Sequence, residues 1–274
     1  MVFTNGISVS LLTVLSFMMA LPFIWMFATS FKTFDKVFVY PPQFIPKLFH
    51  WRNYLEVLHE APFGLYFSNS VLTTLIIIAA QLASSIFAAY AFARMTFKGK
   101  QLLFFLVLAT MMIPIQVTFI PNFLIIKQFG WFDTYMGLIA PFSANAFGIF
   151  MIRQAFMQVP KELEEAAKLD GCNHFQIITN VMIPLSAASI LTFTLLSFIW
   201  HYNDFFWPLI ATNSESLRTL QVGLSSMISE EGGAKGTQWN LVMAASSLII
   251  FPLIVIFMLV QKHIVKGIAT TGLK

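Results

Sequence analysis

The residues best suited to chemistry are few, and they are spread along the chain. Four acidic residues, Glu162, Glu164, Glu165 and Asp170, lie close together, whereas the five histidines are scattered and Cys172 is the only cysteine. These positions offer no Ser/His/Asp set, no paired carboxylates in a plausible pocket and no metal-ligand spacing. The sequence also lacks the phosphate-binding pattern GxxxxGK(S/T). We therefore expect no catalytic centre in this chain, and no metal or cofactor bound by it.

Charge is scarce in the elements that must position these residues. Lys, Arg, Asp and Glu make up 10% of the 274 residues, against about 25% in an ordinary soluble domain. Six runs of at least 19 residues carry none of these types: 1–31, 61–93, 101–126, 134–152, 171–203 and 236–261. Because about 20 helical residues cross a hydrocarbon core, we expect an all-α polytopic membrane protein with one domain over residues 1–274. The six expected transmembrane helices are approximately 8–30, 65–93, 101–126, 134–157, 182–211 and 239–262.

The positively charged residues predict the orientation of these helices. Nine of the 16 Lys and Arg residues lie at or just after the ends of the second, fourth and sixth expected helices: Arg94, Lys98, Lys100, Arg153, Lys161, Lys168, Lys262, Lys266 and Lys274. Short segments that carry such charge remain on the cytoplasmic side of a membrane, so we expect both termini in the cytoplasm. The net charge of +4 then reflects topology. No tract of five basic residues occurs, and we expect no nucleic-acid partner.

Two polar groups interrupt the apolar runs and are candidates for lining a substrate path. One group surrounds Asp204, the only acidic residue of the fifth expected helix. Ionisable groups within a membrane are often functional. The other lies between Pro114 and Pro121, two prolines that should kink their helix, and broken helices often line transporter pathways. Both groups also fit a purely structural role, in which polar side chains bond neighbouring helices. The candidates are Gln116, Asn122, Tyr202, Asn203, Asp204 and Trp207.

The segment 159–184 contains clear helix boundary signals. Pro160 suits the first turn of a helix and Gly171 suits a left-handed C-terminal stop, which predicts a helix of about ten residues. Asn173 with Gln176 three residues later predicts a capping box for a second helix that runs into the membrane. The first helix should present one narrow face, built from Leu163, Ala166, Ala167 and Asp170. This face suits close approach by another protein, and the same segment also fits a capped surface connector resting on its own bundle.

The pattern Glu165-Ala-Ala-x-x-Asp-Gly171, followed after nine residues by Val181-x-Ile183-Pro184, resembles the EAA loop of membrane subunits of ATP-binding-cassette (ABC) importers. Val181 and Ile183 stand where that motif usually has Ile and Leu, and Ala188 stands where a proline is often found. Other segments are similar to the carbohydrate-uptake branch of this family, of the maltose and glycerol-phosphate type. They include Ala89-Tyr-Ala-Phe-Ala-Arg94, Met112-Ile-Pro-Ile-Gln116 and Trp207-Pro-Leu209. The resemblance spans nearly the whole chain.

This resemblance implies a permease subunit that forms half of a translocation path for a sugar or oligosaccharide. The short cytoplasmic helix between the fourth and fifth transmembrane helices would be a coupling helix that docks on a cytoplasmic ATPase. The residues implied in that contact are Glu165, Ala166, Ala167, Asp170 and Gly171. The implied partners are a second homologous permease, two ATPase subunits that bind ATP and Mg²⁺, an extracytoplasmic solute-binding protein and the lipid bilayer. The implied location is the prokaryotic cytoplasmic membrane.

An ion-coupled secondary transporter is the alternative function. Such carriers usually need intramembrane carboxylates and repeated halves. Asp204 stands alone in the expected spans, and the sequence shows no convincing internal repeat. These observations favour the importer, but they leave its substrate open. Maltodextrins, other oligosaccharides and glycerol phosphate all fit the resemblance, and either this subunit or its paired permease would contact the substrate.

Overall fold

The computed structural model describes residues 2–230 and 237–271. All regular structure in these two ranges is helical, and no strand occurs in them. A helix satisfies its backbone donors and acceptors within one segment, which a chain this apolar requires when lipid surrounds it. The expected all-α fold is therefore confirmed.

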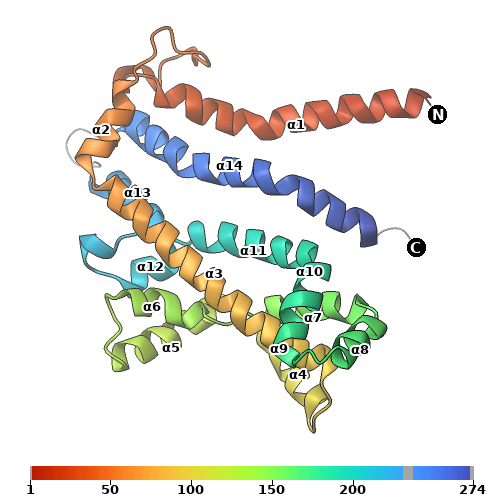
Figure 1. Ribbon diagram of the computed structural model, residues 1–274. Helices are drawn as coiled ribbons and strands as arrows, with labels where there is room; N and C mark the ends of the chain where they lie inside the picture. The colour runs from red at the N-terminus through yellow and green to blue at the C-terminus, as the bar shows by residue number, and fades with distance from the viewer. Residues whose placement is uncertain (1, 231–236, 272–274) are drawn as a thin grey trace. The chain divides into compact units, whose positions relative to one another are not determined.

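Within residues 2–230 and 237–271, three helices are each long and apolar enough to cross a membrane (Figure 1). They are α1 (Val2–Ser30), α3 (Phe63–Arg94) and α14 (Trp239–Thr271). Their candidate spans, Ser8–Ser30, Phe63–Arg94 and Trp239–Leu259, have mean hydropathies of 2.1, 2.1 and 2.6. Each span exceeds the length of about 20 residues that a hydrocarbon core requires.

Three further candidate spans contain a sharp bend. The first consists of α4 (Lys100–Thr110) and α5 (Ile115–Gln128), bent by 98°. The second joins α6 (Tyr135–Ile139) and the 3₁₀ turn η2 (Ala140–Phe142) to α7 (Ala146–Gln158), bent by 45°. The third runs through α9 (His174–Ile177), the π-helical η3 (Ile178–Met182) and α10 (Ile183–Leu185) into α11 (Ala187–Tyr202), bent by 82°. If each bent pair is one span, the described residues hold up to six candidate spans, the number that the sequence predicts.

The bend between α4 and α5 has a local cause. Pro114 immediately precedes α5, with φ −58° and ψ 131°. Proline has no N–H to donate, and it disfavours the helical conformation of the residue before it, here Ile113. The expected helix 101–126 is therefore two helices. Pro121, the second proline expected to kink this segment, lies inside α5.

The expected helix 182–211 is also discontinuous. The helix α11 ends at Tyr202, and a separate helix α12 (Phe206–Ala211) begins after residues 203–205. The carboxylate of Asp204 accepts the backbone N–H of Trp207 at 3.4 Å, so this side chain competes with helical hydrogen bonding. Pro208 lies in the first turn of α12. Backbone N–H groups in a first turn make no hydrogen bond within the helix, so proline is tolerated there.

The helices form two compact units, which are described separately. The first comprises Met1–Leu65 and Leu220–Ile254, and the second comprises Tyr66–Thr219 and Val255–Lys274. The first unit includes the short elements η1 (Phe34–Lys36), α2 (Arg52–Glu60) and α13 (Leu220–Glu230). The second includes the short elements α8 (Lys161–Leu169) and η4 (Glu215–Leu217).

A buried apolar cluster organises the second unit around α3, α7, η3 and α11. We call it the core cluster, and its buried members are Ala89, Tyr90, Ile152, Phe156, Val159, Ile177, Ile178, Met182, Ile190 and Phe193. The helices approach closely at Gly148 of α7, where a Cβ atom would lie 2.4 Å from Phe193 Cζ and 2.7 Å from Ser85 Oγ. Only glycine fits this approach without a shift of its neighbours, which explains its place in α7.

Within the first unit, Asn53 of α2 fixes the chain reversal after α1. Its Nδ2 donates to the carbonyl oxygens of Ser30 at 2.7 Å and Lys32 at 2.8 Å. By contrast, no residue is buried in the 18-residue window that marks the α1 span, although Thr29 and Ser30 at the end of the helix are buried. The apolar surface of α1 therefore remains available to lipid or to another chain.

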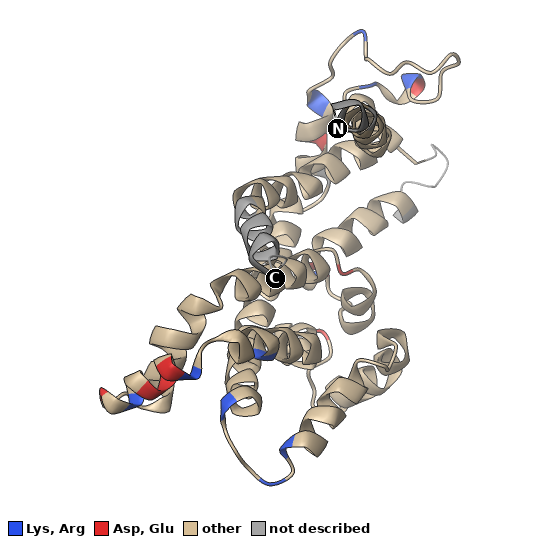
Figure 2. Cartoon of the chain, turned by 90° about the vertical axis from the view of Figure 1, so that its right-hand side faces the viewer, with Lys and Arg blue, Asp and Glu red and all other residues tan. Residues whose placement is uncertain are grey.

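The charged residues lie mainly in loops and short helices, and the long helices are nearly free of them (Figure 2). Acidic residues are concentrated on α8, drawn in red. The cytoplasmic location of both termini stays a prediction. Of the nine positive charges behind it, Lys274 and the side chains of Lys262 and Lys266 lie outside the described residues.

Candidate functional site

The helices α8 and α9 begin with the signals that the sequence predicts. Pro160 occupies the N-cap position of α8, and Glu162 and Glu164 lie in its first turn, where carboxylates interact favourably with the helix dipole. At the start of α9, Asn173 Oδ1 accepts the N–H of Gln176 at 2.9 Å, and Gln176 Oε1 accepts the N–H of Asn173 at 2.9 Å. This reciprocal pair is the expected capping box.

The C-terminal end of α8 is a Schellman motif centred on Gly171. This residue has a φ of +84°, in the left-handed region where glycine has no steric penalty. Its N–H donates to the carbonyl oxygen of Lys168 at 3.0 Å, and the N–H of Cys172 donates to that of Ala167 at 2.9 Å. These two hydrogen bonds satisfy carbonyl groups that the helix end would leave unpaired. The turn between α8 and α9 is therefore well defined by local hydrogen bonds.

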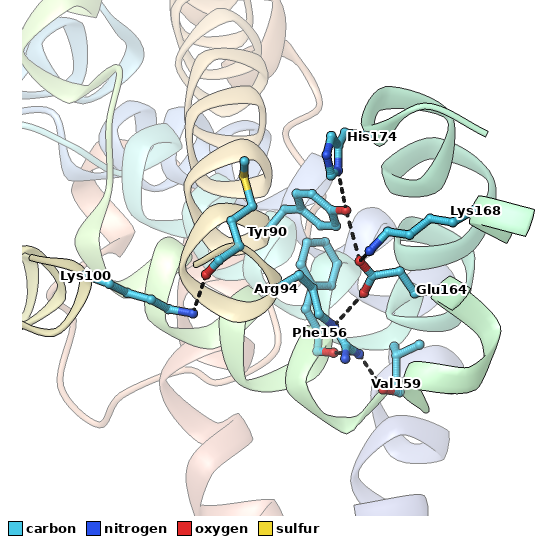
Figure 3. Close-up of polar contacts among 9 residues, drawn as sticks. Tyr90, Arg94, Lys100, Phe156, Val159, Glu164, Lys168 and His174 are labelled. Carbon is cyan, nitrogen blue, oxygen red and sulfur yellow. Dashed lines mark hydrogen bonds and ion pairs between the residues drawn. The ribbon is translucent and has the colours of Figure 1, made fainter. Parts of the chain in front are cut away.

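Glu164 turns away from solvent, unlike most residues of α8. It is 5% exposed, and its carboxylate forms ion pairs with Arg94 Nε at 3.5 Å and Lys168 Nζ at 2.8 Å (Figure 3). The side chain of Arg94 is 6% exposed, so this pair is shielded from water, whereas Lys168 is half-exposed. Burial of a carboxylate without a partner would cost several kcal/mol. Arg94, the last residue of α3, therefore holds α8 against the end of that helix.

Further partners extend this ion pair to neighbouring helices. The hydroxyl of Tyr90, one helical turn before Arg94, donates to Glu164 Oε1 at 3.3 Å and lies 2.9 Å from His174 Nδ1. Arg94 Nη2 also donates to the carbonyl oxygen of Phe156 at 2.7 Å. Contacts thus connect α3, α7, α8 and α9 (Figure 3). We call Tyr90, Arg94, Glu164 and His174 the anchor network.

The outward side of α8 presents apolar and acidic side chains to solvent. Leu163 is 45% exposed and Leu169 is 89% exposed. Of the four residues expected to share one face, Ala167 differs: it is half-buried and packs against the core cluster. The other residues expected to contact an ATPase, Glu165, Ala166, Asp170 and Gly171, are exposed. The helix therefore has an anchored inner side and a free outer side among the described residues.

Sequence reasoning missed the role of Arg94. Arg94 was a topology signal and the end of the family-like segment Ala89–Arg94, and Glu164 was one of four neighbouring acidic residues. One local signal was present, because Tyr90 and Arg94 are four residues apart at the end of an apolar run and must lie on the same helix face. Nothing in the sequence identified the carboxylate that this face would meet.

The substrate-path candidates divide between buried and exposed positions. Tyr202 and Trp207 are each 1% exposed, and Trp207 Nε1 donates to the carbonyl oxygen of Gly137 at 3.0 Å. Asn203 and Gln116 are exposed, while Asn122 and Asp204 are partly buried. The ring of Phe119 on α5 lies 6.2 Å from that of Trp207 on α12, between ring centroids. The structure therefore brings α5, which carries Gln116 and Asn122, next to α12.

A polar network within the second unit was also missed. Gln81 of α3 is 1% exposed. Its Nε2 donates to the carbonyl oxygen of Phe142 at 2.8 Å and lies 3.0 Å from His201 Nε2, while its Oε1 accepts the hydroxyl of Ser197 at 2.7 Å. The sequence offered one signal for this network, the amide side chain of Gln81 within the apolar run 61–93. These hydrogen bonds connect α3, η2 and α11.

Comparison with known proteins identifies the family. The model of the family described as "Binding-protein-dependent transport system inner membrane component" matches residues 81–270. The sn-glycerol-3-phosphate transport system permease protein UgpE of Yersinia enterocolitica is 34% identical over 239 residues, covering 85% of this chain and 84% of the relative. The probable ABC transporter permease protein YurM of Bacillus subtilis is 34% identical over 257 residues, covering 93% and 84%.

A solved structure agrees with the sequence relatives. A chain of a bacterial ABC transporter involved in the import of the acidic polysaccharide alginate superimposes with a TM-score of 0.85. The two chains are 28% identical, and the match covers 95% of this chain and 96% of the other. This chain therefore belongs to the inner-membrane components of binding-protein-dependent transport systems, the multi-pass permease subunits of bacterial ABC importers.

Proposed function

We propose that this permease forms half of the path for a sugar or sugar phosphate and couples it to ATP hydrolysis on separate ATPase subunits. The observation that carries the proposal is the two-sided character of α8. Its outer side exposes Leu163 and Leu169, whereas its inner side is fixed to α3 through the buried pair of Glu164 and Arg94. A nine-residue helix is marginal in water by itself, so burial of its outer side against a partner would stabilise it.

The anchor network supplies the mechanical part of this proposal. An ATPase that moved α8 would also pull on Arg94 and Tyr90 of α3, because Glu164 contacts both side chains. A long transmembrane helix would thereby follow the ATPase. In this proposal, ATP and Mg²⁺ bind the two ATPase subunits, a second permease completes the path, and an extracytoplasmic solute-binding protein delivers the substrate.

The names of similar proteins support a polyhydroxylated substrate. The Yersinia relative is named for sn-glycerol-3-phosphate, and the solved neighbour imports alginate. Maltodextrins, other oligosaccharides and glycerol phosphate remain the candidate classes. A thermal-shift screen of sugars and sugar phosphates against the partner solute-binding protein would identify the substrate. Stabilisation by amino acids or peptides alone would contradict a sugar importer.

Coupling can be tested at Leu169, whose side chain is 89% exposed. We expect Leu169→Glu, in the permease co-expressed with its ATPase subunits, to reduce ATPase co-purification about tenfold or more, because a charge would replace a buried apolar contact. Leu55→Glu on α2 is the matched control, since Leu55 is 59% exposed and distant in sequence from α8. Normal ATPase retention by Leu169→Glu would contradict the docking role.

Uptake by reconstituted complexes separates this function from its alternative. Import into proteoliposomes should require ATP on the ATPase side and should persist when a protonophore or sodium ionophore collapses ion gradients. An ion-coupled carrier would give the opposite pattern. The absence of other acidic residues around Asp204 in the sequence of this span favours the first outcome.

A further inference from the structure

The loop between α1 and α2 carries an unusual concentration of positive charge. Residues 32–52 contain Lys32, Lys36, Lys47 and Arg52, and Asp35 is the only carboxylate among them. Figure 2 shows blue segments along this loop. The Thr33 side chain lowers the pKa of Asp35, and nearby Lys36 and His50 lower it further, so this carboxylate remains ionised. It offsets only part of the positive charge.

The three lysines of this loop line a cavity inside the first unit. Its volume is about 150 Å³, well above the ~15 Å³ that a single water molecule requires on a comparable measure. Three lysines and a histidine contribute to the wall, together with two uncharged polar side chains. The lining residues are Lys32, Thr33, Lys36, Gln43, Pro46, Lys47, Leu48 and His50. The wall therefore has several donors for a negatively charged group and no carboxylate.

Lys32 is the strongest indication of a ligand. It is 3% exposed, and its Nζ has no hydrogen-bond acceptor. The ammonium group lies 4.1 Å from the centroid of the Trp25 ring, which stabilises the charge but accepts no conventional hydrogen bond. Burial lowers the pKa of Lys32, because the charged form loses hydration. An oxyanion in the cavity would supply the missing acceptor and offset the charge.

The surroundings of the cavity point to a membrane surface. Phe38, Tyr40 and Ile45 of the same loop are 77%, 92% and 78% exposed. Trp25, in the last part of the α1 span, contacts the ring of Phe44 at 5.3 Å between centroids. Aromatic and aliphatic side chains exposed beside a helix end are typical of the headgroup layer. Phospholipid headgroups in this layer carry a phosphate, and lysine ammonium groups form charge-assisted hydrogen bonds to phosphate oxygens.

We propose that this cavity binds a phosphate oxyanion, and that the phosphate belongs to a phospholipid in the leaflet around the end of α1. Lys32 Nζ is the buried donor to the phosphate oxygens, and Lys36 and Lys47 close the exposed side of the cavity. The exposed side chains of Phe38 and Ile45 contact the acyl region. The bound headgroup thereby fixes the loop between α1 and α2 to the membrane surface.

Native mass spectrometry of the full-length chain in detergent tests this site with phosphatidylglycerol as the probe. We expect Lys32→Gln and Lys47→Gln each to raise the apparent dissociation constant about tenfold, because a charge-assisted hydrogen bond is lost. Lys47 is exposed, so its replacement leaves packing intact. Arg52→Gln removes the same charge outside the cavity, where Arg52 Nε pairs with Glu56 at 3.1 Å, and should bind as the parent does.

Two comparisons decide the outcome. Monogalactosyl diacylglycerol, which has no phosphate, should not occupy the site. Equal binding by Lys32→Gln, Lys47→Gln and the parent, or an equal loss in Arg52→Gln, would overturn the cavity as the binding site. Displacement of phosphatidylglycerol by millimolar sn-glycerol 3-phosphate or inorganic phosphate, with the same dependence on Lys32 and Lys47, would overturn the lipid as occupant and assign a soluble phosphate instead.

Discussion

At the residue scale, two adjacent carboxylates of α8 have opposite surroundings. Glu164 is buried and paired with Arg94, while Glu165 is exposed. A buried ion pair adds little net stability relative to apolar residues, but removal of one partner leaves an uncompensated charge. The two positions should therefore respond very differently to the same substitution.

Glu164→Gln should destabilise the permease by about 3–5 kcal/mol, because it leaves Arg94 buried without its counter-ion. Glu165→Gln, a matched change on the exposed side, should alter stability by no more than about 0.5 kcal/mol. Denaturant unfolding of the purified chain in micelles measures both values.

The double variant Arg94→Gln and Glu164→Gln completes this experiment. It should recover a substantial part of the stability lost in Glu164→Gln, since neither buried charge remains and the two amides retain hydrogen-bonding capacity. Equal costs for Glu164→Gln and Glu165→Gln, with no recovery in the double variant, would contradict the anchoring role of the ion pair.

At the element scale, features set by neighbouring residues follow from the sequence, and features set by distant ones do not. The stop at Gly171, the capping box of Asn173 and Gln176 and the break at Pro114 each depend on a few consecutive residues. The pairing of Glu164 with Arg94 depends on tertiary packing that brings α8 to the end of α3. The π-helical turns of η3 likewise lacked a decisive local signal.

Close packing of α7 gives a prediction at this scale. Gly148→Ala would place a Cβ atom 2.4 Å from Phe193 Cζ, and the resulting overpacking should cost about 1–3 kcal/mol. Gly64→Ala on α3 is the control, because a Cβ there meets nothing within 4 Å. Gly64 is the second residue of α3, so the change should stabilise the helix by no more than about 0.5 kcal/mol. Thermal unfolding midpoints should move in opposite directions, and a shared direction would refute the close-approach argument.

At the scale of the whole molecule, the scarcity of charge indicated a membrane protein and the family comparison confirmed it. The orientation across the membrane is a separate prediction, which depends on Lys and Arg in short segments. It places α8 in the cytoplasm and the loop between α1 and α2 on the opposite side. These two segments contain strongly exposed side chains, which makes the prediction accessible to chemical labelling.

A cysteine placed at Tyr40 should react with a membrane-impermeant maleimide in spheroplasts, whereas one at Leu169 should react only after permeabilisation. Both positions are highly exposed, at 92% and 89%, so membrane sidedness rather than burial should decide the result. The background for Tyr40→Cys and Leu169→Cys is Cys172→Ser, because Cys172 is the only native thiol. Labelling of Leu169→Cys in sealed spheroplasts would reverse the assigned orientation.

The position of that native thiol has a practical consequence. Cys172 follows the stop of α8, is half-buried and packs against the core cluster. Packing against the core cluster slows the reaction of this thiol with a reagent, so separation of α8 from the core should raise its reaction rate in the unmodified protein. Cys172 is thus a built-in reporter, and under the proposed coupling its reaction rate should change when ATP is added to the complex with the ATPase subunits.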